Sequence, residues 1–331
     1  MWTCPACRTV RDGALQTALL NADFCCTGCG IAWPRVQIGS QRLPVLLADR
    51  QAGEAAARRC EAILGDLRHI GHLAHAEDEQ VRADVEQLAT WAAAHWGRFA
   101  EPPLPGPDLS WVRDWLPPEL PLPDGPVAVL GCGPGAELGQ VRMPGRELIA
   151  WDGHPLLVAF GLYLAEIPGD LVPYRQAPGR LGVRSLRVPE SVREDLRGVR
   201  LACADALDPP LAAESCAAVL AFNLVDSVVD PFLLLQQCEA LLRPGGVLLL
   251  SSPYNWQQTI TPPTLWFDRH LPATMGQAAG VEALLTGQVV PGFLDSMQME
   301  RAADGVAWDL PVHPRFTAHY RLHIMRLRKA L

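Results

Sequence analysis

The sequence has almost no lysine and no long apolar run. Lys329 is the single lysine among 331 residues, and the longest apolar stretch runs only from Cys216 to Phe222. A membrane-spanning helix needs about 18 apolar residues, so none is expected here. The first residues, Met1-Trp2-Thr3-Cys4, lack the basic segment followed by an apolar segment that marks a signal peptide. We therefore expect a soluble cytoplasmic protein with no membrane partner.

The chain also lacks a surplus of basic residues. It has 28 Lys and Arg against 36 Asp and Glu, which gives a net charge of -8. Proteins that bind phosphate backbones usually carry a basic surplus, so nucleic acid is not expected as the main partner. Only the end of the chain, after Asp309, is locally basic. A hydrophobic content of 49% with 19% charged residues argues against disorder, and the length predicts about two domains.

The cysteines are distributed unevenly. Of ten, five lie near the start of the chain: Cys4, Cys7, Cys25, Cys26 and Cys29. Cys4-x-x-Cys7 and Cys26-x-x-Cys29 form two pairs separated by 18 residues, a spacing typical of a zinc site with four sulfur ligands. Because such a shell has no open position, we predict a structural Zn²⁺ bound by Cys4, Cys7, Cys26 and Cys29. Cys25 could replace Cys26, and four unligated thiols are the alternative.

The pattern along the chain predicts four segments. Residues 1–50 hold the cysteine pairs. Residues 51–100 read as two helices, because they are rich in Ala, Glu, Arg and Leu and contain no proline. Residues 101–126 carry nine prolines and form a linker, with one short helical turn around Trp111–Leu116. Residues 127–331 form the remaining, larger domain.

Within this larger domain, short apolar runs alternate with longer mixed segments. Five runs read as buried strands: Val127–Leu130, Leu148–Trp151, Val199–Ala202, Ala217–Phe222 and Gly246–Leu250. Helices are expected between them, for example at Pro155–Ile167 and Pro231–Leu242, and two more strands near the end, at Val306–Leu310 and Phe316–Met325. Alternation of strands and helices predicts an α/β fold, with helices on both faces of a parallel sheet.

A glycine-rich turn follows the first of these strands. Gly131, Gly133 and Gly135 come directly after Val127–Leu130, and a helix is expected to open at Ala136. This order is typical of nucleotide binding, because glycines allow the backbone to approach a ligand and a helix N-terminus favours an anion. The turn alone also satisfies a dinucleotide pattern, so its partners must decide between cofactors.

Polar residues at the ends of the later strands are those partners. Asp152 ends the second strand, where an acid can bind ribose hydroxyls. Asp205-Ala206 follows the third strand and Asn223 the fourth. Arg243-Pro244-Gly245-Gly246 then precedes the fifth strand. All of them stand where open α/β sheets bind ligands, past the carboxyl ends of the strands.

With these landmarks, residues 127–325 resemble class I S-adenosylmethionine-dependent methyltransferases. The resemblance implies a Rossmann-like, seven-stranded sheet whose last two strands are an antiparallel pair. It also implies S-adenosyl-L-methionine as the cofactor, bound by these residues: Gly131, Gly133, Gly135, Asp152, Asp205, Ala206 and Asn223. The sequence departs from the family at Val129, where an acid usually helps to fix the loop. A nicotinamide enzyme and a nucleotide-free α/β domain are the alternatives.

The cysteine segment carries a resemblance of its own. Ala32-Trp33-Pro34-Arg35-Val36 and Arg42-Leu43-Pro44-Val45-Leu46-Leu47 follow the second cysteine pair. Together with the pairs, they resemble a zinc-ribbon family known as activators of tRNA and protein methyltransferases. The resemblance covers residues 1 to about 50. It implies a ribbon that supports a methyltransferase and does no chemistry itself.

Two further segments suggest the methyl acceptor. Asn223-Leu224-Val225-Asp226 and Ser252-Pro253-Tyr254-Asn255-Trp256, with Thr261-Pro262 and Trp266, resemble the methyltransferase domain of ovothiol biosynthesis. That domain methylates an imidazole nitrogen of 4-mercaptohistidine. The sequence departs from it at Phe267-Asp268, where two glycines are expected.

These segments supply candidate catalytic residues. Asp226 could orient or deprotonate a ring N–H, and Tyr254 and Trp256 could stack on a flat ring. The alternatives are that Asp226 caps the following helix and that both aromatic residues belong to the core.

Three functions follow from the sequence. The first is an enzyme that N-methylates a small imidazole or thiol-histidine-like metabolite, the small-molecule methyl acceptor being its partner. The second is an RNA or protein methyltransferase that uses the zinc ribbon for substrate docking. The third is a catalytically silent activator or scaffold, suggested only by Val129.

Overall fold

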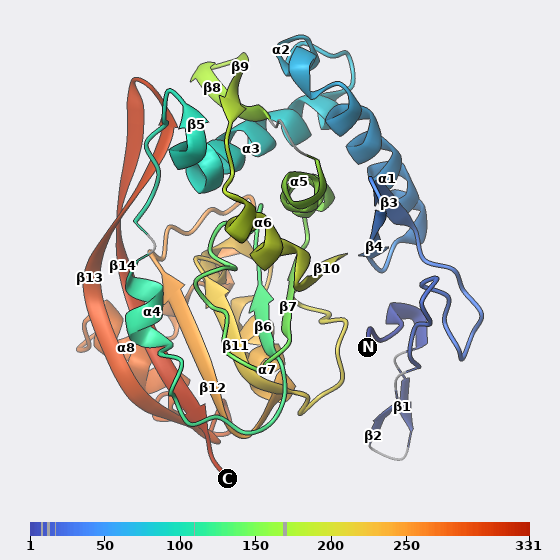
Figure 1. The fold of residues 1–331 in the computed structure, drawn as a ribbon. Coiled ribbons are helices and arrows are strands. Elements are labelled where there is room, and N and C mark those ends of the chain that lie inside the picture. The colour runs from blue at the N-terminus through green and yellow to red at the C-terminus, as the bar shows by residue number, and fades with distance from the viewer. Residues whose placement is uncertain (8, 12–13, 17, 109, 168–170) are drawn as a thin grey trace.

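A nine-stranded sheet forms the centre of the molecule, in the order β13-β14-β12-β11-β6-β7-β10-β4-β3 (Figure 1). The protein is described by a computed structural model over residues 1–7, 9–11, 14–16, 18–108, 110–167 and 171–331. Seven strands correspond to those expected: β6 (Val127–Leu130), β7 (Leu148–Asp152), β10 (Val199–Ala204), β11 (Cys216–Phe222), β12 (Leu242–Ser252), β13 (Met297–His313) and β14 (Phe316–Lys329). The prediction of a Rossmann-like fold is confirmed.

The strand directions also match the prediction. From β12 through β11, β6, β7 and β10 to β4, neighbouring strands are parallel. The hairpin of β13 and β14 is antiparallel and pairs with β12 through β14. Along β6, Val127 and Val129 face one hydrophobic core, and Ala128 and Leu130 face a second. Because both faces are buried, the strand reads as a continuous apolar run rather than as an alternating pattern.

The expectation of seven strands is corrected at the β10 edge. β3 (Arg35–Ile38) and β4 (Gln41–Leu46) extend the sheet there, through parallel pairing of β4 with β10. Residues 35–46 are therefore part of the central sheet, although they fall within the segment predicted to hold the zinc ribbon. The division of the chain into domains remains a prediction.

Helices cover both faces of the sheet. One face carries α1 (Arg50–Gly65), α3 (Glu79–Trp96), α5 (Pro155–Glu166) and α6 (Glu190–Arg197). The other carries α7 (Pro231–Leu241) and α8 (Gln277–Leu285). Aspartates cap the N-termini of α1 and α3. Asp49 accepts a hydrogen bond from the Ala52 amide, and Asp78 accepts hydrogen bonds from the amides of Gln80 and Val81. These contacts satisfy amides that a helix N-terminus leaves without partners.

Smaller elements connect these layers. α2 (Ile70–Leu73) lies between α1 and α3, and the hairpin of β8 (Leu171–Ala177) and β9 (Arg180–Leu186) packs against α3. β5 (Ala100–Glu101) joins that hairpin. The proline-rich segment is irregular except for α4 (Trp111–Trp115), where a short turn was expected, and residue 109 of this segment lies outside the described part. Near the N-terminus, β1 (Thr9–Arg11) pairs with β2 (Ala14–Gln16).

One predicted helix is absent. The sequence predicts a helix opening at Ala136, but residues 131–147 form turns without a helix. Gly139 and the Pro144-Gly145 pair leave too short a stretch for a stable helix before β7 begins. The expected helix N-terminus is therefore not available to bind an anion at the glycine-rich turn.

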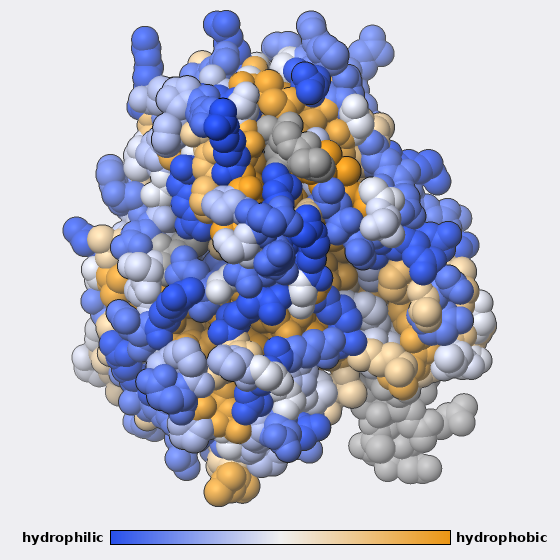
Figure 2. Space-filling model, in the orientation of Figure 1, coloured by the Kyte–Doolittle hydropathy of each residue, from blue (hydrophilic) through white to orange (hydrophobic). Residues whose placement is uncertain are grey.

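One face of the molecule is mostly hydrophilic (Figure 2). On the face shown in Figure 2, apolar side chains form small patches between charged and polar ones. Within the described residues, no helix combines the length and the apolar character needed to cross a membrane.

Candidate functional site

Two adjoining clefts open at the carboxyl ends of the central strands. The first has a volume of about 540 Å³ and the second about 360 Å³. Gly131 and Asp152 line both of them. Asp205 and Ala206 line the first, and Asn223 lines the second with Gly133. Six of the seven residues predicted to bind the cofactor thus come together around one continuous opening.

The glycine-rich turn and Asp152 hold each other in place. The Gly133 amide donates to Oδ2 of Asp152 at 2.9 Å, and the His154 amide donates to Oδ1 at 2.8 Å. Gly131 and Gly133 both have positive φ values, 68° and 51°, which glycine adopts without steric cost. The carboxylate is therefore oriented at the cleft by two backbone amides, and a ribose hydroxyl can still bind to its remaining lone pairs.

The other strand-end residues are similarly fixed. Oδ1 of Asp205 accepts from the Leu207 amide at 2.8 Å. Asn223 has a φ of 52°, and its Oδ1 accepts from the hydroxyl of buried Ser251 at 3.0 Å. Gly135 is the predicted residue that lines neither cleft. A Cβ at this position would come within 2.8 Å of the Leu138 side chain. Its role is to let the turn pack inward.

Helix α3 forms the opposite wall of both clefts. One of its faces presents five residues at spacings of three and four: Gln80, Asp84, Gln87, Trp91 and His95. Asp84 is only 6% exposed, and its carboxylate accepts from Arg59 of α1 at 3.1 Å and from Gln80 at 2.8 Å. The sequence analysis missed this wall. In the sequence, these residues form a mostly polar row beside the apolar stripe of the helix. Such a row is also typical of a helix face that is exposed to solvent.

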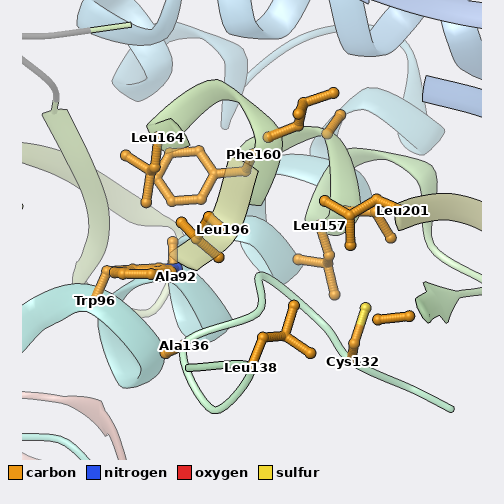
Figure 3. Close-up of a cluster of buried hydrophobic side chains, with 14 of the residues drawn as sticks. Ala92, Trp96, Cys132, Ala136, Leu138, Leu157, Phe160, Leu164, Leu196 and Leu201 are labelled. Carbon is orange, nitrogen blue, oxygen red and sulfur yellow. The ribbon is translucent and has the colours of Figure 1, made fainter. Parts of the chain in front are cut away.

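The same helix also forms two hydrogen bonds with the glycine-rich turn. The Trp96 indole donates to the Pro134 carbonyl at 2.9 Å, and Nδ1 of His95 accepts from the Ala136 amide at 3.3 Å. Figure 3 shows Trp96 beside Phe160 of α5 and Leu196 of α6, in the core that reaches Ala136 and Leu138 of the turn. Two side chains of α3 thus hold the glycine-rich turn in place by hydrogen bonds.

The three predicted catalytic residues lie elsewhere. Asp226, Tyr254 and Trp256 line neither cleft. Oδ2 of Asp226 accepts from the Asn255 amide at 2.6 Å, and burial raises the pKa of this carboxyl to about 6, although that amide lowers it. Asp226 does not cap the following helix either, because the carboxylate at the start of α7 is that of Asp230.

The aromatic pair belongs to a partly buried stack. The Tyr254 ring stacks on Trp256, which stacks in turn on Trp266. The Tyr254 hydroxyl lies 2.8 Å from Nδ1 of His323, whose Nε2 lies 3.2 Å from a carboxylate oxygen of Glu282. Burial raises the pKa of Tyr254 well above its usual range and lowers the pKa of His323. This arrangement holds the chain after β12, so that Gln257 and Ile260 reach the second cleft.

The four predicted zinc ligands form a separate cluster. The sulfur atoms of Cys4, Cys7, Cys26 and Cys29 all lie within 4.8 Å of one another, whereas Cys25 is not among them. The amides of Gly28 and Cys29 point at the Cys26 sulfur at 3.3 and 3.4 Å. Burial opposes ionisation of Cys26, but these amides and the thiols of Cys7 and Cys29 outweigh it and lower its pKa to about 6. The donor set suits a tetrahedral sulfur site.

A known protein family matches the central part of the chain. Residues 129–250 match the methyltransferase domain family. No curated protein matches the chain. Among solved structures, similar chains include a possible histamine N-methyltransferase from Thermotoga maritima, with 14% identity and a TM-score of 0.35 over 79% of this chain and 100% of that one. A methyltransferase from Methanosarcina mazei has 15% identity and a TM-score of 0.38 over 66% and 97%.

The matched residues contain the part of the molecule that forms the sheet side of the clefts. They run from within β6 to within β12 and include the glycine-rich turn, Asp152, Asp205 and Asn223. The family match thus covers residues 129–250, and the chain is an enzyme, an S-adenosylmethionine-dependent methyltransferase.

Proposed function

We propose that this methyltransferase N-methylates a small metabolite with an imidazole or thiol-histidine-like ring. The observation that carries the proposal is the second cleft, which adjoins the first and is lined by aromatic rings of α3, α4, β11 and β13. With a volume of about 360 Å³ it suits a small ring rather than a polymer. The net charge of -8 also disfavours a phosphate backbone.

The strand-end residues fit the cofactor. We place the adenosine in the first cleft, with Asp152 at the ribose hydroxyls and Asp205 and Ala206 at the base. Gly131 and Gly133 let the backbone approach the ligand, and Asn223 stands on the side that leads to the second cleft. When bound, S-adenosylmethionine supplies a methyl group on a sulfonium. The task left to the chain is to align an acceptor nitrogen with that group and to exclude water.

We give Asp226, Tyr254 and Trp256 a supporting role in this function. They hold the segment that brings Gln257 and Ile260 to the second cleft, through the contact of Asp226 with the Asn255 amide and the ring stack. The acceptor would then contact the lining of the second cleft rather than these three side chains.

We also propose a structural Zn²⁺ at Cys4, Cys7, Cys26 and Cys29. The cluster of four sulfurs supports it, as do the amides directed at Cys26. Elemental analysis of protein purified without chelators should find about one zinc per chain. Cys26→Ser should lose the metal, while Cys25→Ser, its matched neighbour, should keep it. Absence of zinc from the wild-type protein would contradict the proposal.

A methyl-transfer assay tests the proposed function. The enzyme should transfer a labelled methyl group to a ring nitrogen of small imidazole acceptors and leave RNA and protein unlabelled. The second candidate is methylation of RNA or protein, with the cysteine cluster as a docking module. Labelling of these polymers without labelling of imidazoles would favour the second candidate and reject the first.

A further inference from the structure

Within the described part of the chain, the basic side chain that lines the second cleft is His95, whose Nδ1 lies 3.1 Å from a carboxylate oxygen of Glu137. Among the described residues that line it, none is Arg or Lys, whereas Asp152 and Glu137 are acidic. Arg98, just beyond α3, is exposed and lies over the Phe99 ring. The cation of the first cleft, Arg59, is paired with Asp84. A carboxylate or phosphate in the second cleft would therefore lose its hydration without gaining an Arg or Lys partner.

Aromatic rings dominate the same cleft. Trp91 of α3, Trp111 of α4, Phe222 of β11 and Trp308 of β13 all line it. Trp111 and Phe222 meet edge to face, with their centroids 5.3 Å apart. Indole faces attract cations as well as flat rings, and a cation over such a face gains most when it is shielded from water.

Glu137 adds a buried negative charge to this lining. It is 6% exposed, and its Oε2 has no hydrogen-bond partner in the described part of the chain. Nδ1 of His95 lies 3.1 Å from Oε2, and the Arg98 guanidinium has a Coulomb interaction with the same carboxylate. Because Nδ1 also receives the Ala136 amide, the ring satisfies the carboxylate poorly. A cationic ligand would compensate this charge.

From these observations we infer that the second cleft selects a flat heteroaromatic ring that bears an ammonium group and no carboxylate. The inference rests on the proposed function, because it takes this cleft as the acceptor site, and it narrows the acceptor class. The rings would enclose the acceptor, Glu137 would balance its charge, and the amides of Gln87 and Gln257 would offer hydrogen bonds at its edges. Amino-acid acceptors, which carry a carboxylate, would be excluded by the missing base.

Histamine and histidine are suitable probes, since both carry an imidazole and an amine and only histidine carries a carboxylate. Their binding should be measured by calorimetry on the full chain saturated with S-adenosylhomocysteine. Histamine should bind about ten- to a hundredfold more tightly than histidine, as expected for a buried charge left unpaired. Trp91→Ala should weaken histamine binding by about two- to thirtyfold. Glu137→Gln should weaken it too, and Glu119→Gln, at an exposed site, should not.

The possible results distinguish failure of this inference from failure of the proposed function. Tighter binding of histidine than of histamine would overturn the inference and leave an imidazole methyltransferase in place. Histamine affinity unchanged in both Trp91→Ala and Glu137→Gln, with thermal unfolding like that of the wild type, would also overturn it. Binding of neither probe, together with methylation of RNA or protein, would reject the proposed function and the inference together.

Discussion

The two walls of the clefts are built differently. The sheet wall presents backbone groups and short polar side chains at strand ends, each fixed by a hydrogen bond within one or two residues or across one strand pair. The helical wall presents long side chains of α1 and α3, such as Arg59, Trp91 and His95, which reach the clefts only because these helices dock against the sheet. The first wall suits a constant cofactor and the second a variable acceptor.

The different roles of the two walls have a physical basis. Backbone amides and strand-end carboxylates keep their positions when surface residues change, because the buried sheet determines them. Side chains on one helix face can change without affecting the sheet. We therefore expect cofactor affinity to depend mainly on the sheet wall. We expect acceptor specificity to depend on Trp91 of the helical wall together with the rings of α4, β11 and β13 that line the second cleft. Three variants test the sheet wall, a residue outside both walls and the contact between the walls, beginning with the largest expected effect.

Asp152→Ala tests the sheet wall. The change removes the proposed ribose partner and the acceptor for the Gly133 amide. Loss of hydrogen bonds to a charged group should cost about 1.5–3 kcal/mol, or roughly tenfold or more in S-adenosylmethionine affinity. Calorimetry measures the affinity, and thermal unfolding shows whether the fold survives. Unchanged cofactor affinity would show that Asp152 does not bind the ribose of the cofactor.

Asp226→Asn tests a residue that belongs to neither wall. Burial raises the pKa of Asp226 to about 6, so the folded protein binds this proton more tightly than the unfolded chain does. The contribution of Asp226 to stability should therefore be greatest below about pH 4 and fall as the pH rises through 6. Asn keeps an oxygen for the Asn255 amide and removes the charge. Relative to this variant, the wild type should lose on the order of 2 kcal/mol between pH 4 and pH 7.

Turnover of the same variant provides a second reading. With a supporting role for Asp226, methyl transfer should stay near the wild-type rate. A fall of about 10² to 10⁴ with normal cofactor binding would instead show that Asp226 accepts a proton from the acceptor, as the sequence alone suggested.

Trp96→Phe tests the contact between the walls. It removes the hydrogen bond from the indole to the Pro134 carbonyl but keeps an aromatic ring in the core. The expected cost is about 1 kcal/mol in the free energy of unfolding, with a loss of cofactor affinity of no more than severalfold. Chemical denaturation and calorimetry measure the two effects. A loss of acceptor binding alone would contradict a role in holding the turn.

The sheet wall could be predicted from the sequence because its signals are local. Asp152, Asp205 and Asn223 each follow an apolar run, and parallel strands bring their carboxyl ends together. The four cysteines proposed to bind zinc could be selected for the same reason. The spacing to Cys29 favoured Cys26 over Cys25, and the cluster in the structure contains Cys26.

The helical wall could not be predicted, because its position depends on tertiary docking. The row from Gln80 to His95 has helical spacing, but spacing alone does not say whether water or a cleft faces it. The helix expected at Ala136 is absent because Gly139 and the Pro144-Gly145 pair interrupt it. The contacts of the turn with His95 and Trp96, about 40 residues earlier in the chain, could not be predicted from spacing. β3 and β4 were missed because their pairing with β10 joins distant segments.

Direct titration of the wild-type protein with S-adenosylmethionine and, separately, with NAD tests the central claim that the strand-end clefts bind a methyl donor. S-adenosylmethionine should bind at one site per chain, and NAD should show no tight binding. Tight binding of NAD, or no binding of S-adenosylmethionine to a folded chain, would contradict the account.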